Sequence, residues 1–332
     1  MQNFNYHSHT YRCGHADFGT TDEDYIIDYI KMGFQKVAFT DHAPEKNVID
    51  KRPNMRMNYS QKDEYLNNLD RLKQKYCDKI QIESGFEVEY LPNNKENLIE
   101  LKSATDKLIL GQHFIYDNNH NLKVFGHSIF SSEELIKYAT YIDEACSLNI
   151  PNIIAHPDIY MLNRPTFGKI ESNIANMICS SAEKYNIPLE INLNNIFNKT
   201  YYENRHLNND SLEFQRLKLK NVFYPCKEFW DIATNYNVKV LYGLDTHHKA
   251  QIFLCHELLG LSNEIIGDDI LSKLNFIKNE PQLLNLLCLI IKVYLVIFYL
   301  SSLSDKSFSS RMNVTLCPFK LTSFSSVILT SV

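Results

Sequence analysis

Short apolar runs alternate with longer amphipathic stretches over the first 280 residues of the chain. The apolar runs have the length of buried strands, and the amphipathic stretches repeat their apolar positions at helical spacing. Strands that alternate with helices pair in parallel, because each helix returns the chain to the same end of the sheet. Strands are predicted at 2–8, 36–42, 80–88, 107–115, 152–157, 188–193 and 238–245. Helices are predicted at 22–33, 60–76, 131–148, 172–185 and 227–236.

Two of the predicted helix boundaries carry their own signals. Ser131 precedes one helix and Glu134 follows three residues later, which is the pattern of a capping box. Gly33 stands at the end of another helix, where a glycine commonly terminates the helical backbone. Both signals support the boundaries drawn from the apolar pattern.

Polar residues able to bind a metal or a phosphate stand at the ends of the predicted strands. They are His7 and His9, Asp41 and His42, Glu87, His113, His156, Asn192, and Asp245 with His247. In a ring of parallel strands these ends meet on one face, where barrels of strands and helices hold their active sites. An open doubly wound sheet gathers its ligands at one switch point instead. The pattern therefore predicts an α/β fold, a closed seven-stranded barrel with its active site at the C-terminal ends of the strands.

Two pairs of residues give the strongest metal signal. His7 and His9 stand two residues apart on a strand, so they share a face and both imidazoles can reach one ion. Such a pair is a weak signal by itself. Asp245 and His247 form a second pair at the end of the last predicted strand, and the first and last strands of a closed barrel are neighbours. The two pairs are therefore predicted to lie side by side.

A carboxylate and two further histidines complete this first group. Glu87 ends the third strand, where a carboxylate can bridge two ions as two-metal hydrolases require. Glu89 has the same strand parity and is the second choice for that role. His113 and His156 add nitrogen ligands around the bridged pair.

A second nitrogen-rich pocket is predicted from His15, His42 and His247. Cys13 lies between His9 and His15 and could act as a ligand, but a small loop residue near the site is the preferred interpretation. Imidazole and carboxylate ligands without thiolate suit Zn, Mn or Fe.

Composition narrows the class of partner. The net charge is −5 and the chain has no dense basic stretch, which argues against a nucleic-acid partner. A small phosphorylated substrate stays compatible with this charge, because bound metals would supply the positive charge. Eight cysteines at irregular positions form no C-x-x-C pair, and no secretory leader precedes the first strand. Mostly buried, reduced thiols in a cytoplasmic protein are the prediction.

The last part of the chain differs from the rest, because all twelve histidines precede residue 281. The stretch 283–303 is almost wholly apolar, broken by Asn285 and Lys292. We predict one domain at 1–280 and an atypical, poorly ordered tail at 281–332. The tail is interpreted as a terminal helix packed on the barrel or as an extension without function. A membrane anchor is disfavoured, because a lysine near the bilayer centre costs about 3 kcal/mol.

These motifs resemble the polymerase-and-histidinol-phosphatase (PHP) superfamily, and most closely its histidinol-phosphatase branch. The resemblance covers about 1–280 and keeps the family order. It consists of H-x-H at 7–9, His15, T-D-H-A at 40–43, G-F-E-V-E-Y at 85–90, L-G-Q-H-F at 110–114, A-H-P-D at 155–158, L-E-I-N at 189–192 and G-x-D-x-H at 243–247.

The resemblance implies a distorted (β/α)7 TIM-like barrel with three divalent metal ions. One ion would take His7, His9, Glu87 and Asp245. A second would share Glu87 and add His113 and His156. The third would take His15, His42 and His247.

The activity implied by the resemblance is hydrolysis of L-histidinol phosphate to L-histidinol and phosphate, a step of histidine biosynthesis. A hydroxide bridging two ions is the expected nucleophile, with Glu87 and Asp245 as the catalytic residues. Another small phosphomonoester or a nucleotide is the alternative substrate. A metal-dependent amidohydrolase also uses H-x-H, but it lacks this glutamate and the three-ion pattern. A non-enzymatic metal-binding protein is the remaining, disfavoured alternative.

Substrate contacts are predicted at four positions. Arg164 and Arg205 are candidates for a phosphate clamp, since an arginine can bind phosphate through two parallel hydrogen bonds. Glu190 and Asn192 are predicted to orient ligands or to bind the substrate amine. The segments 159–163 and 193–195 depart from the family pattern, so the resemblance specifies the chemistry more firmly than the substrate.

Overall fold

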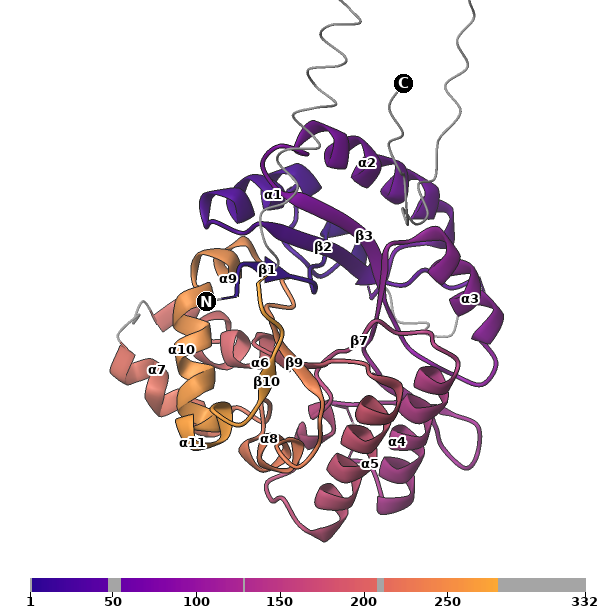
Figure 1. The fold of residues 1–332 in the computed structure, drawn as a ribbon, viewed down its shortest axis with the longest axis vertical. Coiled ribbons are helices and arrows are strands. Elements are labelled where there is room, and N and C mark those ends of the chain that lie inside the picture. Colours follow the sequence, from indigo (N-terminus) through magenta and orange to yellow (C-terminus); the bar gives the residue numbers. More distant parts are fainter. Residues whose placement is uncertain (1, 47–54, 128, 208–211, 280–332) are drawn as a thin grey trace, which may run out of the picture. The chain divides into compact units, whose positions relative to one another are not determined.

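The computed structural model describes residues 2–46, 55–127, 129–207 and 212–279 (Figure 1). The predicted tail at 281–332 lies outside the described residues. Within these residues, no helix has both the length and the apolar character needed to span a membrane.

Eight parallel strands form one curled sheet in the order β1-β2-β3-β4-β7-β8-β9-β10. The strands are β1 (Phe4–Asn5), β2 (Lys36–His42), β3 (Gln81–Val88), β4 (Lys107–Leu110), β7 (Ile153–Ile154), β8 (Leu189–Asn192), β9 (Lys239–Gly243) and β10 (Asn275–Phe276). In Figure 1 the strands lie around a common centre and the helices lie outside them. The predicted parallel α/β fold is therefore confirmed, but the predicted count of seven strands is wrong.

The eighth strand pairs with the first half of β9, through Asn275 with Lys239 and Phe276 with Val240. It has only two residues and follows a short helix, so no apolar run marks it in the sequence. At the other end of β9 the first strand comes close: Ser8 and Thr246 form a parallel bridge. This bridge brings the ends of the first and last predicted strands together.

Eleven α-helices are present in the described part of the chain. They are α1 (Asp22–Lys31), α2 (Lys62–Lys75), α3 (Lys95–Ala104), α4 (Ser132–Ser147), α5 (Lys169–Tyr185), α6 (Asn194–Phe197), α7 (Leu212–Lys218), α8 (Lys227–Ala233), α9 (Lys249–Phe253), α10 (Cys255–Ile266) and α11 (Asp268–Leu271). The capping box before α4 is confirmed: Ser131 Oγ accepts the Glu134 N–H at 3.2 Å, and the Ser131 N–H donates to Glu134 Oε2 at 2.8 Å. Gly33 follows α1 with φ +82°, a backbone conformation that favours glycine.

The predicted strand at 107–115 is two strands. The main sheet contains only β4, and after it the chain enters an antiparallel hairpin of β5 (Phe114–Tyr116) and β6 (Leu122–Val124). His113 stands just before this hairpin, at the edge of the cavity described below. The hairpin therefore places apolar side chains beside the site. In a single long strand, these side chains would have been part of the main sheet.

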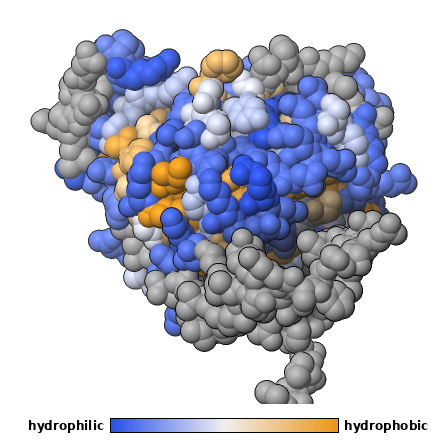
Figure 2. Space-filling model, turned by 90° about the horizontal axis from the view of Figure 1, so that it is seen from above, coloured by the Kyte–Doolittle hydropathy of each residue, from blue (hydrophilic) through white to orange (hydrophobic). Residues whose placement is uncertain are grey.

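The interior of the curled sheet holds a small apolar cluster. Its buried members are Phe4, Tyr6, Ala38, Ile109, Ile153, Ala155 and Leu241. Alternate residues of a strand share a face, so the face of Ala38 continues to His42 at the end of β2. This strand face thus contributes to the apolar floor and then places a polar side chain above it. The surface seen in Figure 2 is mostly hydrophilic, with few apolar patches among its described residues.

Five cysteines among the described residues are free and buried: Cys13, Cys146, Cys179, Cys226 and Cys255. This agrees with the predicted buried thiols.

Candidate metal centre

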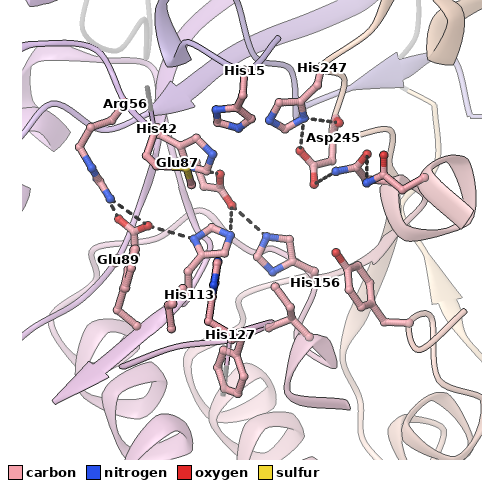
Figure 3. A pocket seen from close by; sticks show the side chains of 18 of the residues that line it. His15, His42, Arg56, Glu87, Glu89, His113, His127, His156, Asp245 and His247 are labelled. Atoms are coloured by element: carbon pink, nitrogen blue, oxygen red, sulfur yellow. Dashed lines mark hydrogen bonds and ion pairs between the residues drawn. The ribbon is translucent and has the colours of Figure 1, made fainter. Parts of the chain in front are cut away.

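Glu87, at the end of β3, lies at the centre of the predicted ligands (Figure 3). Its Oε1 is 2.9 Å from His156 Nε2 and 3.5 Å from His113 Nε2. Its Oε2 is 2.9 Å from His42 Nδ1 and 3.4 Å from His9 Nε2. A carboxylate that offers each oxygen to different imidazoles has the arrangement required to bridge two ions.

His7 and His9 meet Asp245 beside this carboxylate. The two Nε2 atoms are 3.1 Å apart, and Asp245 Oδ1 lies 3.3 Å from the first and 3.1 Å from the second. His7 Nε2 also lies 3.6 Å from Glu87 Oε1. Four groups, from β3 and from the segments that follow β1 and β9, thus converge, because the bridge between Ser8 and Thr246 holds these two segments together.

The third predicted set, His15, His42 and His247, is looser. The rings of His15 and His247 stack at 4.7 Å between centroids, whereas those of His42 and His247 are 6.2 Å apart. Ligand atoms of His247 also lie within 4.8 Å of those of His9 and His42, and, in another group, of Cys13 and His15. The structure therefore brings the three histidines into one region but offers more than one way to combine them.

Glu190 fixes the orientation of His7 from behind. Its two oxygens are 2.9 and 3.1 Å from His7 Nδ1, so Nδ1 carries the proton and Nε2 faces the centre. Asn192 donates to Glu190 Oε2 at 2.9 Å and to Asp245 Oδ2 at 3.3 Å. Glu190 and Asn192 are 1% and 0% exposed and do not line the cavity. The structure thus places them where they orient ligands, not where they would touch a substrate amine.

Gly111 and Gly243 leave room for the side chains of Glu87 and Glu190. A Cβ at Gly111 would stand 1.8 Å from Glu87 Oε1, and a Cβ at Gly243 would stand 1.7 Å from Glu190 Oε1. Gly111 follows β4, the neighbour of the strand β3 that carries Glu87, and Gly243 ends β9, the neighbour of the strand β8 that carries Glu190. Their role in the sequence motifs is therefore to let a carboxylate lie across the adjacent backbone.

Three imidazole nitrogens of the buried centre have no hydrogen-bond partner: His9 Nδ1, His156 Nδ1 and His247 Nε2. A buried polar atom without a partner is costly unless something binds it. His156 and Asp245 also have φ values of 29° and 48°, which are strained for residues other than glycine. The unpartnered His247 Nε2 and the strained backbone at His156 and Asp245 fit a centre built to hold cations.

The protonation states of the side chains in the centre also favour metal binding. Burial raises the pKa of Glu87, but His113, His42 and His7 outweigh it and bring that pKa well below its usual value. Burial also raises the pKa of Asp245, and His7 and His247 again outweigh it. Burial, with His247 close by, lowers the pKa of His9 to about 3. Ionised carboxylates beside a neutral imidazole form the donor set that divalent metals bind.

A cavity of about 450 Å³ opens onto these ligands. One wall is apolar and comes from Met55, Phe114, Val124, Phe125 and Ile159. The other is polar and comes from Asn194, Asn198, Tyr202, Tyr224 and His248. Burial raises the pKa of Tyr224 well above its usual value, so its phenol stays protonated and can donate a hydrogen bond.

Arg56 also lines this cavity, although no motif had marked it as a site residue. It lies in a segment without periodic pattern. Its Nη1 donates to the Ala43 carbonyl at 3.0 Å and to Glu89 at 3.2 Å. Glu89 also bonds His113 Nδ1 at 2.9 Å. The second-choice carboxylate Glu89 therefore orients a histidine and an arginine, while Glu87 occupies the centre.

The two predicted arginines do not line the cavity. Arg164 donates to Glu171 Oε1 at 2.8 and 2.6 Å and to the Phe130 carbonyl at 2.8 Å. Arg205 lies over the Tyr202 ring, 4.0 Å from its centroid, and borders an adjoining hollow. Arg164 is thus occupied by a structural ion pair, whereas Arg56 lines the cavity.

Residues 5–194 match the PHP domain family, a stretch that includes seven of the nine predicted ligands. The chain belongs to the PHP domain family. The family predicted from the strand-end motifs is therefore confirmed.

Curated relatives of this PHP protein include histidinol-phosphatases. A probable histidinol-phosphatase of Schizosaccharomyces pombe is 37% identical over 120 residues, which are 34% of this chain and 38% of that protein. The histidinol-phosphatase of Bacillus subtilis is 28% identical over 122 residues, 35% of this chain and 45% of that protein. The matched stretches thus span less than half of either relative.

A solved structure has the same fold. The histidinol phosphate phosphatase of Lactococcus lactis, in complex with Zn, L-histidinol and phosphate, has a TM-score of 0.54 to this PHP protein at 18% identity. The likeness covers 79% of this chain and 94% of that one. At 18% sequence identity, this likeness is evidence that the two chains share a fold.

Proposed function

We propose that this PHP protein is a metal-dependent phosphomonoesterase that hydrolyses L-histidinol phosphate to L-histidinol and phosphate, as a cytoplasmic enzyme of histidine biosynthesis. The observation that carries the proposal is Glu87, whose two oxygens each face different imidazoles in a buried centre. The curated relatives named as histidinol-phosphatases, and the Lactococcus lactis complex with L-histidinol and phosphate, support the choice of substrate.

Three divalent ions, Zn, Mn or Fe, belong to the proposal. His7, His9, Glu87 and Asp245 would hold the first. Glu87, His113 and His156 would hold the second, and His15 with His247 the third, with His42 as the further ligand implied by family resemblance. When bound, such ions offset the charge of a phosphoryl group and lower the pKa of water to about 7.

The chain's own residues prepare this centre. Glu190 bonds His7 Nδ1 and so keeps Nε2 facing the centre, and Asn192 donates a hydrogen bond to Asp245. These two ligands are therefore held in a fixed orientation. Preorganised groups need no rearrangement as the phosphoryl group changes geometry, which is the main source of rate enhancement in such sites. Glu87 and Asp245 would act as the catalytic residues, and both line the cavity.

The cavity walls fit the two ends of the substrate. Arg56 brings a permanent positive charge to the ligand end, where the phosphate would lie. The Tyr224 phenol can donate a hydrogen bond to a phosphoryl or ester oxygen. Asn194 and Asn198 offer amide groups for the ammonium and imidazole, and Phe114 and Phe125 form an apolar surface for a ring.

Phosphate release tests the proposal. Purified protein with added Zn²⁺ or Mn²⁺ is given histidinol phosphate, other small phosphomonoesters, nucleotides and an acyl-amide panel. Preferential release from histidinol phosphate supports the proposal. Release only from nucleotides or other monoesters would select the alternative substrate, and amide cleavage would select the amidohydrolase.

Single-residue variants test whether phosphate release depends on the proposed metal ligands. His7→Ala and Glu87→Ala should each abolish release while the protein stays folded. His256→Ala is the matched control, because His256 is exposed on α10 and does not line the cavity. Unchanged release in both ligand variants would refute the site.

A further inference from the structure

Asp158 is a buried carboxyl that the proposed mechanism does not use. Its side chain is fully buried and does not line the cavity. Among the described residues, no lysine or arginine forms an ion pair with it, and its Oδ1 has no hydrogen-bond partner. A carboxyl buried without a cation is costly. A group of this kind, close to the site but outside the cavity wall, is a candidate for holding other residues in place.

The other oxygen of Asp158 joins two segments of the chain. Its Oδ2 accepts the Cys226 N–H at 2.7 Å and the Trp230 Nε1–H at 3.1 Å. Cys226 is the N-cap residue of α8, and Trp230 lies within that helix. Asp158 itself stands in the segment after β7, two residues beyond His156. The carboxyl therefore ties the start of α8 to the segment that carries a predicted metal ligand.

Tyr224 lies directly before this tie and lines the cavity. Its backbone is held on both sides by buried side chains. On one side, Asn195 Oδ1 accepts the Phe223 N–H at 2.9 Å and the Tyr224 N–H at 3.4 Å. On the other side, two residues later, Cys226 donates to Asp158. The position of Tyr224 thus depends on one amide and one carboxyl, neither of which lines the cavity.

The Tyr224 phenol is placed to act on a bound phosphoryl group. Its ring centroid is 6.2 Å from that of His156. Burial and the nearby Asp245 carboxylate raise the pKa of the phenol, which therefore keeps its proton. A tyrosine has only two side-chain torsions, so the position of its backbone largely determines where its hydroxyl lies. Any group that fixes this backbone therefore also fixes the donor.

We propose that Asp158 is a positioning residue for Tyr224: its two hydrogen bonds hold the start of α8 and so keep the phenol at the cavity, where it donates to a phosphoryl oxygen of the substrate. Asp158 binds no ion and transfers no proton in this role. The inference rests on the proposed phosphomonoesterase, but it does not depend on which alcohol the phosphate leaves.

A double-mutant cycle tests whether Asp158 acts through Tyr224. Tyr224→Phe should lower kcat for phosphate release by about 10-fold or more, because one hydrogen bond to a charged group is lost. Asp158→Ala should lower kcat by a similar factor and keep the wild-type metal content. The double variant should be no slower than the slower single variant, since residues that act as one unit are not additive. Effects that multiply, an unchanged kcat in Asp158→Ala, or loss of bound metal from it, overturn the proposal.

Two further variants separate positioning from a general loss of stability. Asp158→Asn should recover most of the rate, because the amide oxygen can still accept both hydrogen bonds. A rate as low as that of Asp158→Ala would contradict this. The matched control is Glu171→Gln, which should keep the wild-type rate. Glu171 is also a buried carboxyl that accepts a backbone N–H, from Gly168 at 2.9 Å, but it does not line the cavity.

Crystal structures keep the test independent of turnover. The zinc-loaded Asp158→Ala protein should show the Tyr224 hydroxyl displaced from its wild-type place. Asp158→Ser, whose side chain is too short to reach both donors, should show the same displacement and guards against one variant failing to fold. A Tyr224 that keeps its place in these variants overturns the proposal, even where the wild type releases phosphate. A wild type that releases phosphate from no monoester refutes the proposed function instead.

Discussion

Gly111→Ala perturbs the proposed bridging carboxylate without touching a ligand. Gly111 is not among the glycines with positive φ, so alanine fits its backbone. The new Cβ would stand 1.8 Å from Glu87 Oε1, 2.5 Å from Cδ and 2.8 Å from Cγ. Ordinary contact begins at 3.4 Å, so the carboxylate must withdraw from its place between the imidazoles.

The expected cost falls on function more than on folding. Glu87 is 1% exposed, and its oxygens contact His156 and His42 at 2.9 Å, so withdrawal separates it from these partners. A misplacement of about 1 Å in such a site lowers the rate by about 100-fold. We therefore expect Gly111→Ala to reduce kcat for phosphate release by at least that factor and to lower the bound metal content.

The matched control is Gly260→Ala. Gly260 lies in α10, and nothing stands within 4 Å of the position of its Cβ. Alanine is favoured over glycine in a helix by about 0.8–1 kcal/mol, so this variant should keep its rate and resist urea slightly better than the wild type. Steady-state phosphate release, elemental analysis and urea unfolding are measured on both variants. Wild-type rate and metal content in Gly111→Ala would refute the bridging role of Glu87.

Three further predictions concern the surroundings of the centre. Glu190→Gln should weaken metal binding by about 10–100-fold, because His7 loses the carboxylate that orients it; competition with a chelator measures this, and unchanged affinity contradicts it. Zn²⁺ at about 100 times its dissociation constant should raise the free energy of unfolding by about 2.7 kcal/mol through binding to the folded chain alone; a calorimetric midpoint that zinc leaves in place would argue against a preformed site. Burial, with Glu89 nearby, raises the pKa of Glu45 to about 7. Folding therefore favours protonated Glu45, and its stabilising effect is complete below about pH 4 and lost as pH rises through about 7. Glu45→Gln should thus gain stability relative to the wild type across that window, and urea titrations at both ends would show no such gain if the carboxyl were unperturbed.

The sequence predicted the strands whose apolar runs are long and whose last residue is polar. For β2 and β3 the predicted and observed ends agree within a residue, because each strand passes from a buried run straight to Asp41 or Glu87. The two-residue β10 escaped prediction, since its hydrogen bonds to β9 depend on where the chain returns and not on its own pattern. Length and periodicity specify an element only when the element is long enough to show them.

For the site, residue types predicted which side chains lie close together better than they predicted which side chains bond to each other. The nine ligand candidates lie in one region, because eight stand near the ends of parallel strands and His15 lies in the loop after the first strand. Glu190, which the sequence predicted to orient ligands or to bind the substrate amine, contacts His7 Nδ1. Arg56 could not be predicted, because it reaches the cavity from a segment without pattern. Arg164 followed a suitable motif but pairs with Glu171, a contact that requires the position of α5. Tertiary neighbours, not local sequence, decide which charged side chain faces the cavity.

Counting the metal ions bound to the purified protein tests the central claim most directly. Elemental analysis after gel filtration from excess Zn²⁺ should find more than one tightly bound ion per chain in the wild type. Glu87→Ala should lose at least two, because both ions that share this carboxylate depend on it. A wild type that releases phosphate without bound metal, or a Glu87→Ala variant with the full metal content, would contradict the account.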